Sequence, residues 1–200
     1  MRYLVISDIH DNLKNLVHAL EIARKHNVSK IFFCGDLVSP FVISVIKERL
    51  WNDVEFIGVW GNNEGDRDTI LMKAQGLTYG KSILLKTFNR LRFLIVHGFE
   101  DIGTTEHVIK SLLKSNDYDV ILYGHTHRAK VFALNKTKGS IEEYDVLKEL
   151  KRKDKVDLVF DTRRVSLAIN PGELCGYLTG VSTIVIIDVE GEAMIHYIKL

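Results

Sequence analysis

The sequence predicts an α/β fold whose core is two layers of β-sheet covered by helices. In the first half of the chain, short apolar runs alternate with segments whose apolar residues recur at helical spacing. In the carboxyl half, apolar runs follow one another with few helical segments between them. A two-layered sheet core flanked by helices accounts for both patterns.

The first strand and helix set the pattern of the amino-terminal half. Residues 3–6 form a continuous apolar run, as expected of a strand that is buried on both faces. A helix follows with its apolar residues on one face, and Asp11 or Asn12 is expected to cap its first turn. By the same criteria, further strands are expected at 31–34, 54–59, 82–87, 91–96 and 119–123, and further helices at 40–50, 66–74 and 105–114.

A charged segment interrupts the strands of the carboxyl half. Strands are expected at 129–134, 165–169, 182–188 and 193–198, with a turn at Glu190-Gly191. Segment 136–164 holds nine Lys/Arg and seven Asp/Glu. Its apolar residues favour an amphipathic helix with a charged outer face; they are Ile141, Tyr144, Leu147 and Leu150. We therefore interpret residues 1–200 as a single domain and 136–164 as a charged helical insertion. We expect this insertion to pack near the opening of a functional site or at a subunit interface.

Composition and charge limit the classes of protein to which the chain can belong. Apolar residues make up 46% and charged residues 26%, the balance of a soluble globular protein. The formal net charge of +1 argues against a nucleic-acid partner, because such proteins usually carry a basic surface. No stretch reaches the ~18 apolar residues of a membrane span, and the amino terminus lacks the apolar core of a signal peptide. Two cysteines make no disulfide framework, so we expect a cytoplasmic protein with no membrane partner. Exposed strands late in the chain would suit a homodimer or a higher homo-oligomer.

The stretch Tyr123-Gly124-His125-Thr126-His127 gives the first indication of a functional site. Residues i and i+2 of an extended chain point to the same side, so His125 and His127 could ligate one metal together. Alone, the pair is equally consistent with polar histidines in a loop.

Four other apolar runs end in residues of the same kind, at the strand ends where open α/β sheets bind ligands. Each has an alternative interpretation, because Asp8 and Asp36 could cap helices and Asn62 could belong to a turn. Taken together, these alternatives require the same coincidence at five strand ends. The candidate metal ligands are Asp8, His10, Asp36, Asn62, His97, His125 and His127.

Seven ligands are too many for one tetrahedral zinc ion, which takes four, and they suit two ions that share a carboxylate. Asp, His and Asn donors favour hard or borderline divalent ions: Mn, Fe, Ni, Co, Zn or Mg. Two such ions can activate a bridging water and hold the oxygens of a phosphate during in-line displacement. The residues alone therefore point to hydrolysis of a phosphoester.

Five ordered motifs carry a family resemblance: Asp8-x-His10, Gly35-Asp36, Gly61-Asn62-x-Glu64, His97-Gly98 and Gly124-His125-x-His127. With the later Asn170-Pro171-Gly172, they resemble the calcineurin-like metallophosphoesterases, and most closely their small single-domain prokaryotic members. The resemblance implies a four-layer α/β/β/α sandwich with two mixed sheets flanked by helices.

The resemblance also implies a function and a division of the ligands. It implies phosphomonoesterase or phosphodiesterase activity, commonly supported by Mn²⁺ or Ni²⁺. Of the two we favour a dinuclear phosphodiesterase, in which a metal-bridging hydroxide attacks a small or nucleotide-like phosphoester. His125 and His127 would then serve different ions, and Asp36 would bridge them. The implied ligands are Asp8, His10, Asp36 and His127 for the first ion, and Asp36, Asn62, His97 and His125 for the second.

Asn63 departs from the family pattern. Members of the family often carry histidine here, which is proposed to protonate the leaving oxygen, and the small members often carry cysteine. An amide donates a hydrogen bond but supplies no proton near neutral pH. We therefore expect modest activity, best on phosphodiesters with acidic leaving groups, with Asp36 and Asn63 in catalytic roles. Asp11 also stands where glycine is common, so the loop after His10 could differ in shape.

Three alternatives stay open from the sequence. Glu64 either orients a metal ligand or is an acidic residue at a helix start. Arg128 either binds the substrate phosphate, as Asn63 would, or is a surface arginine. The whole chain could instead be a non-catalytic or weakly active metal-binding scaffold, because a retromer subunit with this fold serves as a binding platform.

Overall fold

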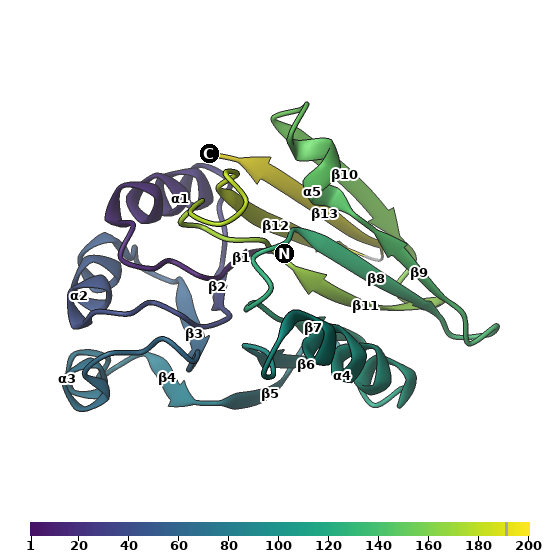
Figure 1. The fold of residues 1–200 in the computed structure, drawn as a ribbon, viewed down its shortest axis with the longest axis horizontal. Helices are drawn as coiled ribbons and strands as arrows, with labels where there is room; N and C mark the ends of the chain where they lie inside the picture. Colours follow the sequence, from purple (N-terminus) through teal and green to yellow (C-terminus); the bar gives the residue numbers. More distant parts are fainter. Residues whose placement is uncertain (191) are drawn as a thin grey trace.

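Two mixed β-sheets stack face to face and carry helices on their outer surfaces (Figure 1). The structure, a computed structural model, describes residues 1–190 and 192–200. Within these residues, seven strands form one sheet in the order β10-β13-β12-β1-β2-β3-β4. They are β1 (Arg2–Ile6), β2 (Lys30–Phe33), β3 (Glu55–Val59), β4 (Thr78–Lys81), β10 (Lys155–Phe160), β12 (Thr183–Glu190) and β13 (Glu192–Lys199). Strands β1 to β4 are parallel, and β12, β13 and β10 continue the sheet antiparallel.

The second sheet has six strands among the described residues, in the order β5-β6-β7-β11-β8-β9. They are β5 (Ile83–Phe88), β6 (Leu91–Val96), β7 (Val120–Leu122), β8 (Lys130–Asn135), β9 (Ile141–Tyr144) and β11 (Val165–Asn170). Its central strands β6, β7 and β11 are parallel, and the outer strands pair antiparallel.

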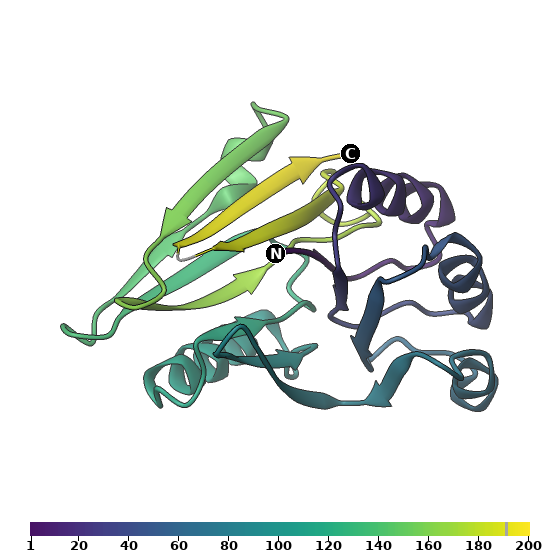
Figure 2. The same ribbon diagram turned by 180° about the vertical axis from the view of Figure 1, so that it is seen from behind.

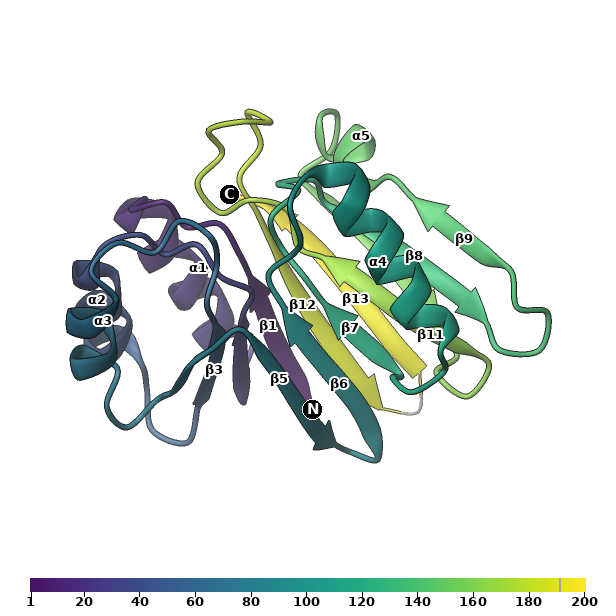
Figure 3. The same ribbon diagram turned by 60° about the horizontal axis from the view of Figure 1, so that its bottom comes forward.

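Helices cover both outer surfaces. Helices α1 (Leu13–Lys25), α2 (Pro40–Arg49) and α3 (Arg67–Lys73) lie together along the first sheet, whereas α4 (Ile102–Lys114) lies across the second (Figure 3). A short helix, α5 (Val146–Leu150), lies at one end of the sandwich. The four-layer α/β/β/α arrangement with two mixed sheets is thereby confirmed.

Alternation along β1 shows why a continuous apolar run suits this architecture. Tyr3 and Val5 pack between the sheets, whereas Leu4 and Ile6 pack beneath the helices. Because successive side chains of a strand point to opposite faces, a strand between two apolar layers needs apolar residues at every position. Asn12 caps α1 by accepting a hydrogen bond from the backbone N–H of Asn15 at 3.1 Å.

Outside segment 136–164, one strand and the start of one helix differ from the expectation by more than two residues. Strand β4 was not predicted, because Thr78–Lys81 has little apolar character. Helix α4 begins at Ile102, three residues before the expected start, because Asp101 caps it and accepts from the N–H of Thr104 at 2.7 Å. Of the turn expected at Glu190-Gly191, Gly191 lies outside the described residues.

Segment 136–164 is the largest correction, because only Val146–Leu150 of the expected amphipathic helix is helical. The segment forms β9, the five-residue α5 and β10. Ile141 and Tyr144 have helical spacing, but they pair with Leu134 and Val131 of β8. This pairing supplies hydrogen bonds to a strand that would otherwise form the edge of its sheet, and β10 extends the other sheet by pairing with β13. Tertiary strand pairing thus outweighs the local helical pattern.

The topology places the functional loops at one edge of the sandwich. Strands β1, β2 and β3 run parallel as neighbours in one sheet, and so do β6, β7 and β11 in the other. Their carboxyl ends therefore face a common region, whereas the long antiparallel strands extend to the opposite side from α1, α2 and α3 (Figure 2). None of the helices in the described residues is long and apolar enough to cross a membrane.

Candidate metal centre

The structure brings all seven predicted metal ligands into one cluster. Each follows the carboxyl end of a parallel strand, and Asp8 and Asp36 are fully or almost fully buried. Neither aspartate caps a helix, because the capping positions of α1 and α2 are Asn12 and Ser39. The cluster consists of Asp8 and His10 after β1, Asp36 after β2, Asn62 after β3, His97 after β6, and His125 and His127 after β7.

Asp36 lies between the two halves of the cluster. Its Oδ2 atom is 3.5 Å from Nε2 of His10 and 3.4 Å from Nε2 of His97. The two histidines belong to different ligand sets in the division that the family resemblance implies. One carboxylate oxygen therefore has the position required of a group shared by two cations.

The first half of the cluster contains buried polar atoms that lack partners. Oδ1 of Asp8 is 3.3 Å from Nε2 of His127 and 3.9 Å from Nε2 of His10. Among the described residues, neither this oxygen nor Nε2 of His10 has a hydrogen-bond partner. Buried polar atoms normally do, so the donor set fits a cation that these atoms would ligate.

Three atoms with lone pairs converge in the second half. Oδ1 of Asn62 lies 3.0 Å from Nε2 of His97 and 2.9 Å from Nδ1 of His125. The other ring nitrogens face carbonyl oxygens: Nδ1 of His97 donates to Cys34 O at 2.6 Å, and Nε2 of His125 donates to Glu100 O at 2.7 Å. Because a carbonyl oxygen only accepts, the nitrogens that face Asn62 carry lone pairs in the neutral rings. A cation between these atoms fits the arrangement.

Strained backbone holds the ligands in place. Five of the seven have a positive φ: Asp8, His10, Asp36, His125 and His127. Non-glycine residues rarely adopt this region, and such strain gathers at functional sites. Glycine is required beside them, because a Cβ at Gly61 would overlap Oδ1 of Asp36 and one at Gly124 would overlap Oγ of Ser7. Asp11, where glycine was expected, has φ of 59° and accepts from the N–H of Ser39 at 2.9 Å.

Glu64 organises the loop that carries Asp36. Its Oε1 accepts from the backbone N–H groups of Asp36 and Gly61, both at 3.0 Å. Its Oε2 accepts from the N–H groups of Leu37 and Val38, both at 3.1 Å. Four backbone donors on one carboxylate mean that Glu64 positions the loops that carry Asp36 and Gly61. Asp66 rather than Glu64 caps α3.

Burial and charge act in opposite directions within the cluster. Burial, the largest influence on Asp8, raises the pKa of its carboxyl against the opposing effect of His97 and His127. Burial also opposes ionisation of Asp36, but hydrogen bonds from the protonated form of His97 and from Asn63 outweigh it and hold its pKa below the ordinary value. Burial would lower the pKa of His97, yet its bond to Asp36 and the nearby carboxylates raise it. A bound cation would supply the positive charge that protons supply to these buried carboxylates and histidines in its absence.

Asn63 and Arg128 occupy different surroundings. The backbone N–H of Asn63 donates to Oδ1 of Asp36 and its side-chain amide donates to Oδ2, both at 2.8 Å. Asn63 therefore contacts the shared carboxylate directly. Arg128 is exposed and lines a separate hollow of about 340 Å³ with Lys148 and Lys151 of the α5 region.

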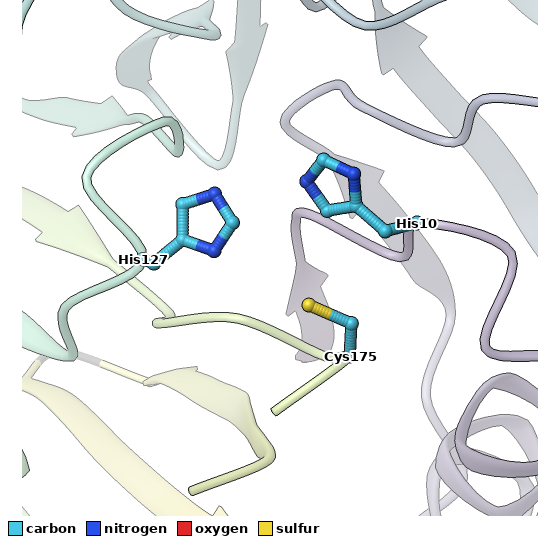
Figure 4. A group of neighbouring side chains, drawn as sticks. All are labelled: His10, His127 and Cys175. Carbon is cyan, nitrogen blue, oxygen red and sulfur yellow. The ribbon is translucent and has the colours of Figure 1, made fainter. Parts of the chain in front are cut away.

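Two residues of the cluster escaped the sequence interpretation. Oε2 of Glu173 accepts from Nδ1 of His127 at 2.8 Å, which leaves Nε2 of that histidine to face Asp8. Cys175 follows two residues later and points toward His10 and His127 (Figure 4). The available signal was Asn170-Pro171-Gly172, a sixth strand end at which Glu173 and Cys175 follow at once.

We predict that Glu64→Gln weakens metal binding at both halves of the cluster by about 10- to 100-fold, as hydrogen-bond partners of metal ligands generally do. The amide nitrogen of glutamine would face backbone N–H donors, so the loop of Asp36 would lose its shape. Calorimetric titration of metal-free protein with Mn²⁺ measures the effect. Glu21→Gln, an exposed change on α1, is the matched control, and equal affinities of both variants would contradict the role of Glu64.

A second prediction concerns the acid stability of the metal-free protein. Burial would raise the pKa of Glu173, but hydrogen bonds from His127, Thr179 and Cys175 outweigh it and lower that pKa from 4.5 to about 2. The resulting stabilisation is complete above pH 4.5 and is lost as the pH falls toward 2. Glu173→Gln should therefore lower the free energy of unfolding near neutral pH and flatten its decline in this range. Urea unfolding at a series of pH values measures this, and an unchanged slope would contradict it.

Comparison with known proteins agrees with the fold and the cluster. Residues 1–192 match the model of the calcineurin-like phosphoesterase superfamily domain. The chain is 34% identical over 193 residues to phosphodiesterase MJ0936 of Methanocaldococcus jannaschii, covering 95% of this chain and 94% of that protein.

Solved structures extend the comparison. A structure described as a novel archaeal phosphodiesterase superposes with a TM-score of 0.73 at 32% identity, covering 100% of both chains. Zinc-complexed Vps29 of Entamoeba histolytica shares the fold with a TM-score of 0.62 at 15% identity, covering 100% of this chain and 93% of that one. The sandwich, the potential metal-binding groups and the near full-length match together show that the chain belongs to the calcineurin-like phosphoesterase superfamily.

Proposed function

We propose that the protein is a dinuclear metal-dependent phosphodiesterase. The observation that carries the proposal is the position of Oδ2 of Asp36, at 3.5 Å from His10 and 3.4 Å from His97. A carboxylate in this position can belong to two metal sites at once. The near full-length similarity to phosphodiesterase MJ0936 supports the same reaction class.

The proposed ligands fall into two sets. When bound, two divalent cations activate a water for attack on phosphorus and neutralise the charge that develops on its oxygens. The chain's own residues would hold these cations, and Glu173, Cys34 and Glu100 fix the tautomers of the histidines. The first set is Asp8, His10, Asp36 and His127, and the second is Asp36, Asn62, His97 and His125.

A hollow beside the second set would receive the organic part of the ester. It has a volume of about 370 Å³ and is bordered by Asn62, His97 and His125. Trp60 and Arg67 also line it, with the guanidinium carbon 5.3 Å from the centre of the indole ring. An aromatic surface beside a cation suits a nucleotide-like group, because bases stack on aromatic rings and their phosphates attract cations.

The direct test is a screen of metals against substrates on protein stripped of metal. We expect Mn²⁺ or Ni²⁺ to restore hydrolysis of bis(p-nitrophenyl) phosphate above that of p-nitrophenyl phosphate, with Fe, Co, Zn and Mg as further ions to compare. Asp36→Asn should lose activity about 100-fold or more, because it removes the charge that two cations share. Retained metal binding without turnover under every ion would instead favour a metal-binding scaffold.

A separate prediction concerns Asn63. Its amide is held by the shared carboxylate and has no proton to give, so we expect activity to depend strongly on the acidity of the leaving group. Asn63→His should raise the rate on alkyl phosphodiesters by about 100-fold, the lower range of general acid catalysis, and change the rate on p-nitrophenyl esters much less. Equal effects on both substrate classes would contradict a missing general acid.

We further propose that Arg128 binds a phosphate oxygen of the substrate from its position next to His127. Its neighbours in the hollow, Lys148 and Lys151, add positive charge. Arg128→Gln should raise KM for bis(p-nitrophenyl) phosphate about tenfold, the value of a charged hydrogen bond, with little change in kcat. Arg152→Gln, an exposed change near the same helix, is the control, and an unchanged KM in the Arg128 variant would identify a plain surface arginine.

A further inference from the structure

Cys175 shares a small space with two of the proposed metal ligands. One ligand atom each of His10, His127 and Cys175 lies within 4.8 Å of the others. The three side chains come from different loops, after β1, β7 and β11, and converge on the same region (Figure 4). The donor set proposed above contains only oxygen and nitrogen, so the thiol is a donor that this set does not use.

The backbone fixes the position of this cysteine. The N–H of Cys175 donates to the backbone oxygen of Asp8 at 3.1 Å, and the side-chain amide of Asn12 donates to the backbone oxygen of Cys175 at 3.0 Å. The residue is only 3% exposed. Cys175 is therefore attached to the loop that carries Asp8 and His10 and is shielded from bulk solvent.

Unpartnered atoms of Asp8 and His10, in the loop to which Cys175 is attached, provide an independent indication of a ligand. The side chain of Asp8 is 0% exposed, and within the described residues its Oδ1 and Nε2 of His10 lack hydrogen-bond partners. Oδ1 of Asp8 faces Nε2 of His127 at 3.3 Å and Nε2 of His10 at 3.9 Å. A cation that satisfies them would lie among the same three loops as the sulfur.

Glu173 couples the sulfur to the metal-ligating histidine. Its Oε2 accepts from Sγ of Cys175 at 3.0 Å and from Nδ1 of His127 at 2.8 Å. The oxygen thus orients the thiol and the imidazole together. If the thiol proton leaves, Glu173 keeps its bond to His127 and its bonds from Leu178 and Thr179.

We propose that Cys175 ligates the first cation as a thiolate, in addition to Asp8, His10, Asp36 and His127 of the first set, and makes this site select a thiophilic ion. On binding, the S–H bond breaks, its proton passes to solvent, and a sulfur–metal bond forms. Sulfur favours softer ions such as Zn²⁺ or Cd²⁺ over Mn²⁺, whereas the second site offers only oxygen and nitrogen. The two sites therefore differ in preference. This inference rests on the two-cation site of the proposed function.

Spectroscopy of the metal complex tests the proposal without turnover. Metal-free protein is titrated with Co²⁺ and with Cd²⁺, and ultraviolet sulfur-to-metal charge-transfer absorption is recorded. The wild type should show the band at the first equivalent, and Cys175→Ser should lack it. Serine keeps a donor for Glu173, so this variant separates ligation from the positioning of His127. The preference of Cys175→Ser for Cd²⁺ over Mn²⁺ should be at least about tenfold weaker than that of the wild type. Loss of a ligand should cost no less than the loss of a hydrogen-bond partner of a ligand, which costs about tenfold or more.

Two controls keep the result interpretable. Cys34→Ala changes the other cysteine, which packs between the sheets, and should retain the band. If Cys175→Ser fails to fold by circular dichroism, X-ray absorption of the wild type with one equivalent of Zn²⁺ decides the matter. The proposal requires a sulfur neighbour at about 2.3 Å.

A wild-type complex with no charge-transfer band and no sulfur neighbour overturns the proposal and leaves Cys175 as a positioning residue for Glu173. A band that persists in Cys175→Ser also overturns it. These outcomes are independent of the proposed activity. Hydrolysis without a sulfur ligand would refute only the role of Cys175 as a ligand. A sulfur ligand in a protein that hydrolyses no phosphoester would refute only the proposed phosphodiesterase activity.

Discussion

The carboxylate of Asp36 is the group on which the rest of the site depends. It lies almost fully buried between His10 and His97, one from each ligand set. Asn63 holds both of its oxygens, and Glu64 holds the backbone on either side of it. Burial of an anion is unfavourable unless hydrogen bonds and positive charge offset it. The surrounding donors supply part of that compensation, and a pair of cations would supply the rest.

The sandwich places this anion at an edge where several loops can bring polar side chains around it. Three parallel strands of each sheet end at the same edge, so six loops meet there. Each loop contributes one or two polar side chains, and five of the seven candidate ligands lie on left-handed backbone. The strain is sustained because the strands below pack between two apolar layers and do not yield. Stability of the core and geometry of the site are therefore linked.

Local patterns predicted most elements, and their failures have physical causes. The strands buried on both faces and the helices α1 and α2 follow directly from apolar periodicity. The segment 136–164 does not, because Ile141 and Tyr144 gain more by pairing with β8 than by forming a helix. Strand β4 likewise depends on its neighbour β3 and has no strong pattern of its own. Pairing with a distant strand leaves no trace in the local sequence.

By itself, the sequence determined which residue types stand at the ends of the strands, and hence the chemistry of two cations and a phosphoester. It did so because ligand chemistry is a property of side chains, and each candidate directly follows an apolar run. Only the tertiary structure decided which other residues join them. Glu173 and Cys175 enter the cluster because β11 lies parallel to β7 in the sheet, an adjacency between segments more than 40 residues apart. Neighbourhood in a sheet is set by packing and strand order, and these are determined by the whole chain together.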